Sequence, residues 1–326
     1  MAGTVRWGII GTANIARAFF LPAVREAGGE PAAVAGRDTA RVTRWAGENG
    51  AGRAITGYQS LIADPDVDAV YIPLPNSMHG EWTVRALRAG KPVLCEKPLT
   101  GSLAETEQVL AVARETGTPL WEAFVFPFHS QLERLRGLIA DGVIGELQEI
   151  QSNFHFFMTN RQTNIRMLTS LAGGALSDVG CYPVRLARDL FAAEHESAWA
   201  AARWTDGGVD EATWGALGFP GGRRLLLSCG FGREYDTFSR LLGTRGQISV
   251  TNAFHPTPAD TYEVRAHGRE PATFPASGQD QHSFTAAVRH IQAVVRGEEA
   301  PRFLATQTSL GSARALDDLI RSASTP

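Results

Sequence analysis

The stretch Gly8-Ile9-Ile10-Gly11-Thr12-Ala13-Asn14-Ile15-Ala16 decides the fold of the first part of the chain. It ends an apolar run of strand length and opens a helical pattern at residues 15–26. The dinucleotide fingerprint G-x-G-x-x-G/A falls on Gly11, Ala13 and Ala16, with alanine in the middle place. Such a turn needs a glycine at the bend, a small residue beside the pyrophosphate, and a helix N-terminus that binds the anion. We therefore predict dinucleotide contacts at Gly11, Thr12, Ala13, Asn14 and Ile15; an ordinary glycine-rich turn is the alternative.

The end of the next strand distinguishes the two nicotinamide dinucleotides. Enzymes that use NAD place Asp or Glu there to bind the ribose 2′-hydroxyl. Here Gly36 occupies the place of the acid, and Arg37 follows it. A guanidinium binds a 2′-phosphate through two parallel hydrogen bonds. Gly36 and Arg37 therefore predict NADP(H); in the alternative, Arg37 is a solvated loop residue and Asp38 binds the ribose.

Apolar runs divide the chain into two domains. Up to residue 123, strand-length runs alternate with amphipathic helical segments, which is typical of βαβ units and a parallel sheet. These strand candidates are residues 5–10, 32–35, 69–72, 92–95 and 120–123. Beyond residue 124 the candidates are helices at 131–140, 176–191, 281–296 and 309–322, and strands at 147–157, 198–204, 211–219, 223–230, 247–250 and 262–266, with turn residues between the later strands.

The resulting prediction is an α/β protein. Residues 1–123 form a Rossmann domain with a doubly wound parallel sheet that binds NADP. Residues 124–326 form a second α/β domain with an open, mostly antiparallel sheet, which binds the substrate and carries the oligomer contact.

Composition excludes several classes of function. The 326 residues have a formal net charge of −3 and no lysine or arginine run, so we expect neither nucleic acid nor a membrane surface as partner. No apolar stretch reaches the ~20 residues of a membrane helix, and no signal peptide is visible before the first strand. We expect a cytoplasmic protein. Three widely separated cysteines, and no cluster with ligand spacing, predict neither a disulfide nor a metal site.

Three further segments carry a family resemblance. They read Pro73-Leu74-Pro75-Asn76-Ser77-Met78-His79, Val93-Leu94-Cys95-Glu96-Lys97-Pro98 and Gly173-Gly174-Ala175-Leu176-Ser177-Asp178-Val179-Gly180-Cys181-Tyr182-Pro183. Together with the turn at Gly11, they resemble the glucose–fructose oxidoreductase / inositol dehydrogenase (Gfo/Idh/MocA) family over nearly the whole chain. The most specific piece is E-K-P, followed by D-x-G-x-Y at the start of a helix.

The resemblance implies roles for individual residues. It places Lys97 at the nicotinamide with a cis bond to Pro98, and it places Asp178 and Tyr182 in the substrate pocket. Many members carry histidine where this chain has Tyr182; the tyrosine form is similar to sugar dehydrogenases, dihydrodiol dehydrogenases and keto-sugar reductases. Residues 121–124 resemble the aldose dehydrogenases, whereas residues 164–166 resemble the reductases of nucleotide-linked keto-sugars.

The same residues make chemical sense without the resemblance. Hydride transfer to a carbonyl leaves an alkoxide that must gain a proton, and a phenol supplies one when a nearby ammonium lowers its usual pKa of ~10. Lys97 and Tyr182 can form this pair across a domain cleft. Asp178 lies four residues before Tyr182, on the same helical face, where it can hold a sugar hydroxyl. Each of the three has a plain structural alternative: a surface charge, a packing residue or a helix cap.

Weaker candidates complete the site. Pro75, Asn76 and His79 follow a strand end where loops reach the cofactor, although His79 is equally well explained as a structural histidine. Glu96 is a candidate cofactor contact or a helix cap. Arg166 can anchor a substrate phosphate or pair with an acid, and His155 lies in an aromatic strand.

We therefore predict an NADP(H)-dependent oxidoreductase that acts on CH–OH groups of a sugar-like substrate, similar to an aldose 1-dehydrogenase. The alternatives are a ketoreductase for a nucleotide-linked keto-sugar and a non-catalytic NADP sensor. An antiparallel sheet with one uncovered face would expose Trp199 and Trp214, so we also expect a homodimer or a dimer of dimers through that sheet.

Overall fold

The computed structural model describes residues 3–276 and 282–324. The chain divides into two compact units: Met1–Val125 with His282–Leu310, and Phe126–Gln281 with Gly311–Pro326. The chain first passes from one unit to the other after Val125, close to the expected boundary at residue 123. The return of residues 282–310 to the first unit was not expected, because an amphipathic helix does not reveal which core its apolar face joins.

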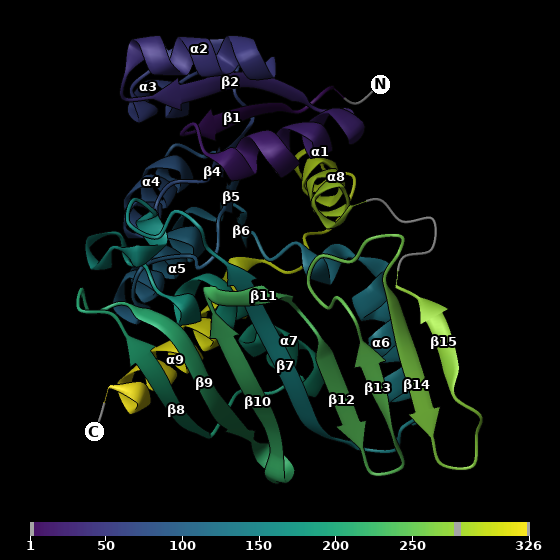
Figure 1. Ribbon diagram of the computed structural model, residues 1–326. Coiled ribbons are helices and arrows are strands. Elements are labelled where there is room, and N and C mark those ends of the chain that lie inside the picture. The colour runs from purple at the N-terminus through teal and green to yellow at the C-terminus, as the bar shows by residue number, and fades with distance from the viewer. Residues whose placement is uncertain (1–2, 277–281, 325–326) are drawn as a thin grey trace. The chain divides into compact units, whose positions relative to one another are not determined.

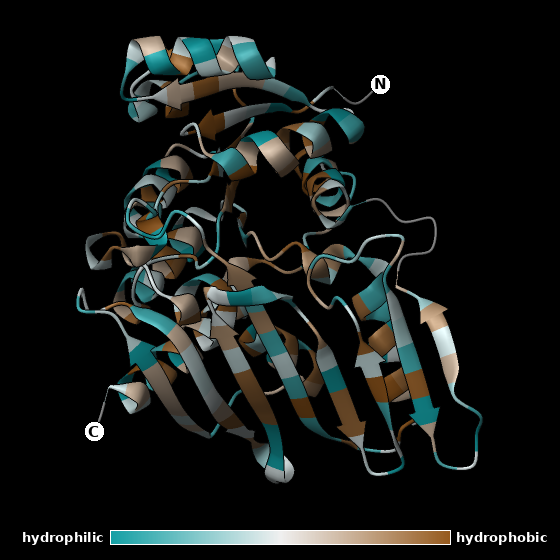
Figure 2. Ribbon diagram, viewed as in Figure 1, coloured by the Kyte–Doolittle hydropathy of each residue, from teal (hydrophilic) through white to brown (hydrophobic). Residues whose placement is uncertain are grey.

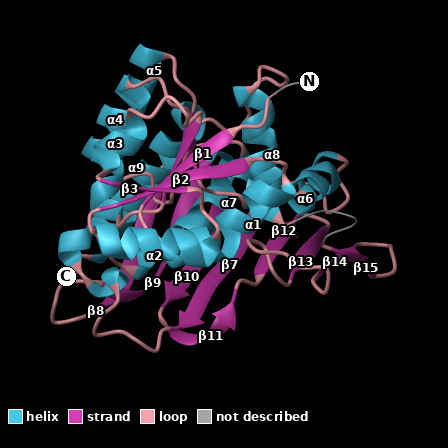
Figure 3. Ribbon diagram, turned by 90° about the horizontal axis from the view of Figure 1, so that it is seen from above, coloured by secondary structure: helices cyan, strands magenta, loops and turns pink. Residues whose placement is uncertain are grey.

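A six-stranded parallel sheet forms the centre of the first unit, in the order β3-β2-β1-β4-β5-β6 (Figure 1). Its strands are β1 Arg6–Ile10, β2 Glu30–Gly36, β3 Arg53–Thr56, β4 Ala69–Ile72, β5 Val93–Cys95 and β6 Leu120–Glu122. Its helices are α1 Leu21–Glu26, α2 Thr39–Asn49, α3 Tyr58–Ile62, α4 Asn76–Arg88, α5 Leu103–Thr116 and α8 Ser283–Val295. This is the predicted Rossmann arrangement, in which the order reverses after β1 and helices cover the sheet (Figure 3).

A nine-stranded sheet forms the second unit, in the order β15-β14-β13-β12-β7-β10-β9-β8, with β11 paired to β7. Its strands are β7 Leu147–Phe157, β8 Ser197–Trp204, β9 Asp210–Phe219, β10 Arg223–Gly230, β11 Gly232–Asp236, β12 Ser239–Gly243, β13 Gly246–Val250, β14 Thr261–Ala266 and β15 Ala272–Pro275. Its helices are α6 Ser130–Ala140, α7 Cys181–Phe191 and most of α9 Ala305–Ala323. Among the described strands of this sheet, β7 and β10 are the one pair that runs in parallel, so the sheet is mostly antiparallel, as predicted. Apolar and hydrophilic residues alternate along its strands (Figure 2).

Several elements differ from the sequence prediction. Strand β3 was not predicted because none of its side chains is buried, so it has no apolar run. Strands β11, β12 and β15 were also missed, and β11 and β15 are likewise mostly exposed. Gln281, the predicted start of a helix, lies outside the described residues. Among the described helices, none is long and apolar enough to cross a membrane.

Candidate active site

The turn after β1 has the geometry that a dinucleotide requires. Gly11 has φ of 109°, a left-handed conformation that favours glycine, and its N–H donates to the Ala35 carbonyl oxygen at 2.9 Å. A Cβ atom on Gly11 would come within 3.0 Å of the Leu74 side chain. Thr12, Ala13 and Ile15 are half-buried and Asn14 is exposed, so the predicted contact residues remain accessible. This backbone fits the pyrophosphate of a nicotinamide dinucleotide.

Residues 36–38, at and just after the end of β2, have different structural roles. A Cβ atom on Gly36 would lie 2.9 Å from the Val42 Cβ, so glycine allows α2 to approach the strand. Asp38 caps α2, because its Oδ1 accepts a hydrogen bond from the Arg41 N–H at 2.7 Å. Arg37 is exposed and has no ion pair with any other residue in the described part of the chain. Its guanidinium therefore remains available to a phosphate.

Lys97 follows β5 and is half-buried, and its bond to Pro98 is cis, as the resemblance implied. Glu96 is buried beneath it. The Glu96 carboxylate accepts from the Tyr71 hydroxyl at 2.7 Å and from the Lys97 backbone N–H at 3.3 Å. Glu96 therefore supports the turn that carries Lys97, whatever other contact it makes.

His79 is fully buried on α4, whose first residue is Asn76 and whose N-cap is Pro75. Its Nδ1 lies 2.8 Å from the Pro98 carbonyl oxygen and its Nε2 lies 2.7 Å from that of Leu74. Burial lowers the pKa of His79, and the two carbonyl contacts oppose that shift. Each carbonyl only accepts, so a neutral ring donates to one of them at a time. Asn76 is half-buried at the start of the helix.

Two of the substrate candidates of the second unit, Asp178 and Tyr182, lie on one helix. A π-helical turn, Leu176–Gly180, contains Asp178 and leads into α7 with Tyr182 in its first turn. The predicted helix at 176–191 thus starts with a wide turn. Gly180 permits the close approach of β10, because a Cβ atom there would lie 2.9 Å from the Cys229 sulfur. Such π turns are frequent at functional sites.

Aromatic side chains surround Tyr182, which is only 7% exposed. Its ring centroid lies 5.0 Å from that of Phe154, 5.2 Å from Phe254 and 5.5 Å from His255. These contacts fix the ring of Tyr182 from several sides. Phe254 and His255 were not singled out in the sequence, because they lie far along the chain in a loop after β13.

Arg166 and Asp178 form an ion pair. Arg166 Nε lies 2.6 Å from Asp178 Oδ2, with the arginine side chain 41% exposed and the aspartate 12% exposed. The loop brings Arg166 there by folding back on itself: the Gly174 N–H donates to the Arg166 carbonyl oxygen at 2.9 Å, and a Cβ on Gly173 would collide with that same carbonyl. Two predicted substrate residues thus meet, and the more exposed one carries the positive charge.

Asp210 supports the start of this helix and was missed in the sequence. It is 3% exposed on β9, and its Oδ2 accepts from the Leu176 N–H at 2.7 Å and the Thr213 hydroxyl at 2.8 Å. Burial raises the pKa of Asp210 to about 6. A Cβ on Gly174 would collide with Asp210 Oδ1, so the glycine at 174 makes room for this carboxylate.

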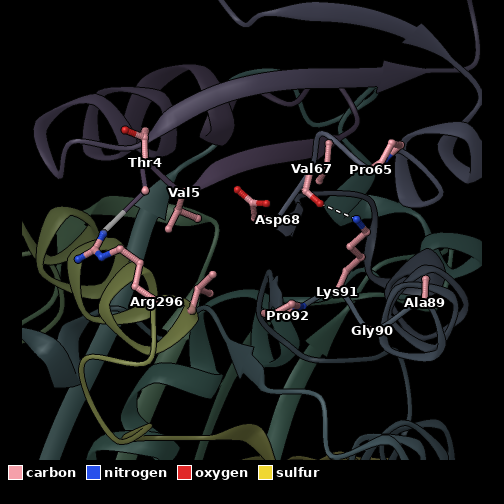
Figure 4. A pocket seen from close by; sticks show the side chains of 12 residues that line it. Thr4, Val5, Pro65, Val67, Asp68, Ala89, Gly90, Lys91, Pro92 and Arg296 are labelled. Atoms are coloured by element: carbon pink, nitrogen blue, oxygen red, sulfur yellow. Dashed lines mark hydrogen bonds between the residues drawn. The ribbon is translucent and has the colours of Figure 1, made fainter. Parts of the chain in front are cut away.

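Other features of the structure lie apart from this chemistry. His155 is buried on β7 with its Nε2 2.9 Å from the Ser228 hydroxyl, and burial lowers its pKa. A pocket of about 510 Å³ in the first unit is lined by Val5, Val67 and Lys91, at the amino ends of strands (Figure 4). The cofactor edge of a parallel sheet is the opposite one. Among residues 3–276 and 282–324, no group of three potential ligands could hold a metal ion.

The structure brings the cofactor candidates to one edge of the first sheet. Gly11, Arg37, Asn76 and Lys97 each follow the carboxyl end of a parallel strand. In open sheets of this type, ligands bind at that edge, where the strand order reverses. The fold and this edge are those of nicotinamide dinucleotide-dependent oxidoreductases.

Comparison with known proteins narrows the class. Residues 5–124 match an oxidoreductase family with an NAD-binding Rossmann fold, and residues 132–249 match the GFO/IDH/MocA C-terminal domain. A D-xylose 1-dehydrogenase (NADP(+)) of Haloferax volcanii is 35% identical over 98% of this chain and 97% of that protein. A dTDP-3,4-didehydro-2,6-dideoxy-alpha-D-glucose 3-reductase of Streptomyces violaceoruber is 40% identical over 90% of this chain and 85% of that protein.

A solved structure of a related enzyme has the same fold. A 3-ketoreductase from Actinomadura kijaniata, in complex with NADP and TDP-benzene, has a TM-score of 0.89 and 33% identity, covering 98% of both chains. Further structures of that enzyme carry a lysine-to-alanine or a tyrosine-to-phenylalanine substitution. The chain belongs to the Gfo/Idh/MocA family and is an NAD(P)-dependent oxidoreductase.

Proposed function

We propose that this protein is an NADP(H)-dependent enzyme that transfers a hydride between the nicotinamide and a hydroxyl or carbonyl carbon of a sugar. One observation carries the proposal: a single helix presents Tyr182 just after the ion pair of Asp178 with Arg166. A phenol for proton transfer thus adjoins a polar pair suited to hydroxyl groups. A non-catalytic NADP sensor has no need of this arrangement.

NADP(H) is the proposed cofactor rather than NAD(H). Asp38 is used as the cap of α2, which makes it less suitable for the ribose, whereas Arg37 is exposed beside it. The 2′-phosphate would pair with this guanidinium. The two relatives whose names or structures include NADP support the same choice.

The proposed chemistry needs one proton transfer by the protein. The bound nicotinamide supplies or accepts the hydride. Tyr182 donates a proton to the carbonyl oxygen in reduction and accepts it in oxidation. The Lys97 ammonium, at the cofactor edge of the first sheet, would hold the ribose of the nicotinamide nucleotide. Asp178 binds a substrate hydroxyl, and Arg166 holds the Asp178 carboxylate at 2.6 Å.

A second candidate substrate class is a nucleotide-linked keto-sugar. The observation that favours it is Arg166, whose side chain is 41% exposed although it pairs with Asp178. Its outer N–H groups can bind a phosphate as well. The reductase relative from Streptomyces violaceoruber supports this class, and the xylose dehydrogenase supports a free aldose.

A substrate panel tests the proposal. The purified protein is mixed with NADP⁺ and a series of aldoses, or with NADPH and a series of keto-sugars, free and linked to dTDP, and the absorbance of NADPH is followed. Turnover of at least one sugar with NADP(H) is expected. Tight NADPH binding without turnover of any member would favour a sensor and contradict the proposed activity.

A further inference from the structure

The turn that carries Lys97 is held by buried side chains at three successive residues. The Lys97 N–H donates to Glu96 at 3.3 Å, and the Pro98 carbonyl oxygen lies 2.8 Å from His79 Nδ1. The Leu99 N–H donates to Glu122 Oε1 at 2.8 Å. The three side chains come from β6, α4 and the turn itself, so the backbone on both sides of the cis bond is fixed from separate elements.

Glu122 is the member of this set to which the sequence assigned no role. It ends β6 and is 7% exposed, and its second oxygen accepts from the Ser309 hydroxyl of α9 at 2.6 Å. A buried carboxylate is costly unless its oxygens are hydrogen-bonded. Both carboxylate oxygens of Glu122 accept hydrogen bonds here, and one of these bonds comes from the backbone of the Lys97 turn. An apolar residue would fill the same space without that cost, but it could not hold the Leu99 N–H.

His79 has the matching role on the other side of the turn. Its ring lies between the carbonyl oxygens of Pro98 and Leu74. Leu74 belongs to the loop after β4, and its side chain lies next to Gly11. It is fully buried, and both ring nitrogens already have backbone partners. A direct contact with a cofactor would require a ring nitrogen of His79 to move away from its carbonyl oxygen.

We propose that Glu122 and His79 are positioning residues that hold Lys97 in its working place through the backbone of residues 98 and 99. This inference rests on the proposed function of Lys97. A displacement of about 1 Å in a reacting group can cost on the order of 10²-fold in rate. A charged acceptor makes a shorter and stronger hydrogen bond than a neutral one, which suits a fixed turn.

The experiment is a double-mutant cycle with Lys97. NADPH affinity and kcat are measured for Glu122→Ala, Lys97→Ala and the double variant, with thermal unfolding to confirm folding. Glu122→Ala is expected to lower kcat roughly 10- to 100-fold and to weaken NADPH binding. In the Lys97→Ala background it should add little to either loss, because the group that it positions is already absent. Glu122→Gln keeps an acceptor for the Leu99 N–H and should recover most of the activity.

Two further variants and one control variant complete the experiment. His79→Phe keeps a ring but removes both nitrogens, including the one that donates to a backbone carbonyl, and Ser309→Ala removes only the outer partner of Glu122. Both should give losses of the same kind, the second one smaller. His290→Gln is the matched control, because His290 is 3% exposed in the same unit, with its nitrogens bonded to Glu299 and Arg302. It should lose stability while NADPH affinity stays within about twofold.

The outcomes distinguish the positioning role of Glu122 and His79 from the function proposed for Lys97. Folded Glu122 and His79 variants with normal kcat, beside an inactive Lys97→Ala, would overturn the positioning role alone. Equal losses in both backgrounds would do the same, because they would show a general effect on the fold. Normal turnover by Lys97→Ala would instead overturn the function proposed for Lys97.

Discussion

Adjacent residues can serve different purposes, as Arg37 and Asp38 show. Both were candidates for the ribose in the sequence, and only contacts separate them. Asp38 is committed to the Arg41 N–H as a helix cap, while Arg37 remains exposed. A helix cap is a local interaction within a few residues, yet the sequence alone does not distinguish an aspartate that caps a helix from one that binds a ligand.

Replacing Arg37 by alanine should reduce the preference for NADPH over NADH. The unmodified protein is expected to bind NADPH more tightly, and Arg37→Ala should lose roughly tenfold or more of that preference, in line with the loss of a charge-assisted pair. Arg44→Ala, at an exposed position on α2, is the control and should change neither affinity. Equal affinities for both cofactors in the unmodified protein would contradict the assignment.

Asp178 should matter more for substrate than for cofactor. Asp178→Asn keeps the shape but weakens the pair with Arg166 and the hold on a hydroxyl. We expect a higher KM and a lower kcat/KM for the sugar, with little change in NADPH affinity. Steady-state kinetics with the best substrate of the panel provide the check. A selective loss of NADPH binding would instead place Asp178 at the cofactor.

The site could be predicted from sequence only where its signal is local. Lys97, Asp178 and Tyr182 stand in short motifs, so their types and spacing were enough to single them out. Asp210 has no such motif, and the segment 121–124 resembled the aldose dehydrogenases without indicating a role for Glu122. Each acts on residues 23 to 34 positions away along the chain, and that pairing exists only once the strands are assembled.

Among the elements, the helix with Asp178 and Tyr182 depends on a buried carboxylate. Asp210 on β9 holds the Leu176 N–H at the start of that helix. Burial raises its pKa from the usual 3.8 to about 6. A folded-state pKa above the unfolded one means that this group contributes most stability below about pH 4 and that the contribution is lost as the pH rises through about 6.

Asp210→Asn should remove this pH dependence. From about pH 5 to about pH 7.5, the unfolding free energy of the unmodified protein should fall by roughly 1.5 kcal/mol relative to the variant. Urea unfolding of both proteins at the two pH values measures the difference, and the contributions of histidines cancel between them. A difference that does not change with pH would show that Asp210 does not titrate in this range.

Element prediction failed mainly where a strand buries none of its side chains, as in three of the four strands that were missed. Strand β7 and strand β10 were predicted at their observed bounds, because their side chains alternate between the core and the open face. Strands β3 and β15 bury none of their side chains and lie at the edges of their sheets. The π turn at 176–180 has no sequence signal either, and the close approach of its Gly180 to β10 exists only once the sheet is assembled.

At the scale of the whole molecule, one face of the second sheet exposes large apolar side chains. Trp199 is 58% exposed, Trp214 46% and Leu226 38%. The strand register places all three on the same face of neighbouring strands, opposite Leu225 and Leu227, which are buried. Exposed apolar patches of this kind mark interaction sites. We propose that two copies of the chain pair through this face, as a homodimer or within a dimer of dimers.

Trp214→Glu should weaken that assembly. Light scattering at micromolar concentration is expected to report a dimer or tetramer for the unmodified protein and smaller species for the variant. Phe274→Glu is the control: Phe274 is also exposed, at 39%, but the register places it on the side of Leu227. A monomer in the unmodified protein would refute the proposed pairing.

If Tyr182 transfers the proton, the substitution Tyr182→Phe should abolish most of the turnover. Tyr182→Phe keeps the ring within its aromatic surroundings and removes only the hydroxyl. We predict a loss of roughly 10²–10⁴ in kcat with nearly unchanged NADPH affinity. An isotope effect with deuterated NADPH must first show that hydride transfer limits the unmodified enzyme. A near-normal kcat for Tyr182→Phe under that condition would contradict the account and assign the proton to another group.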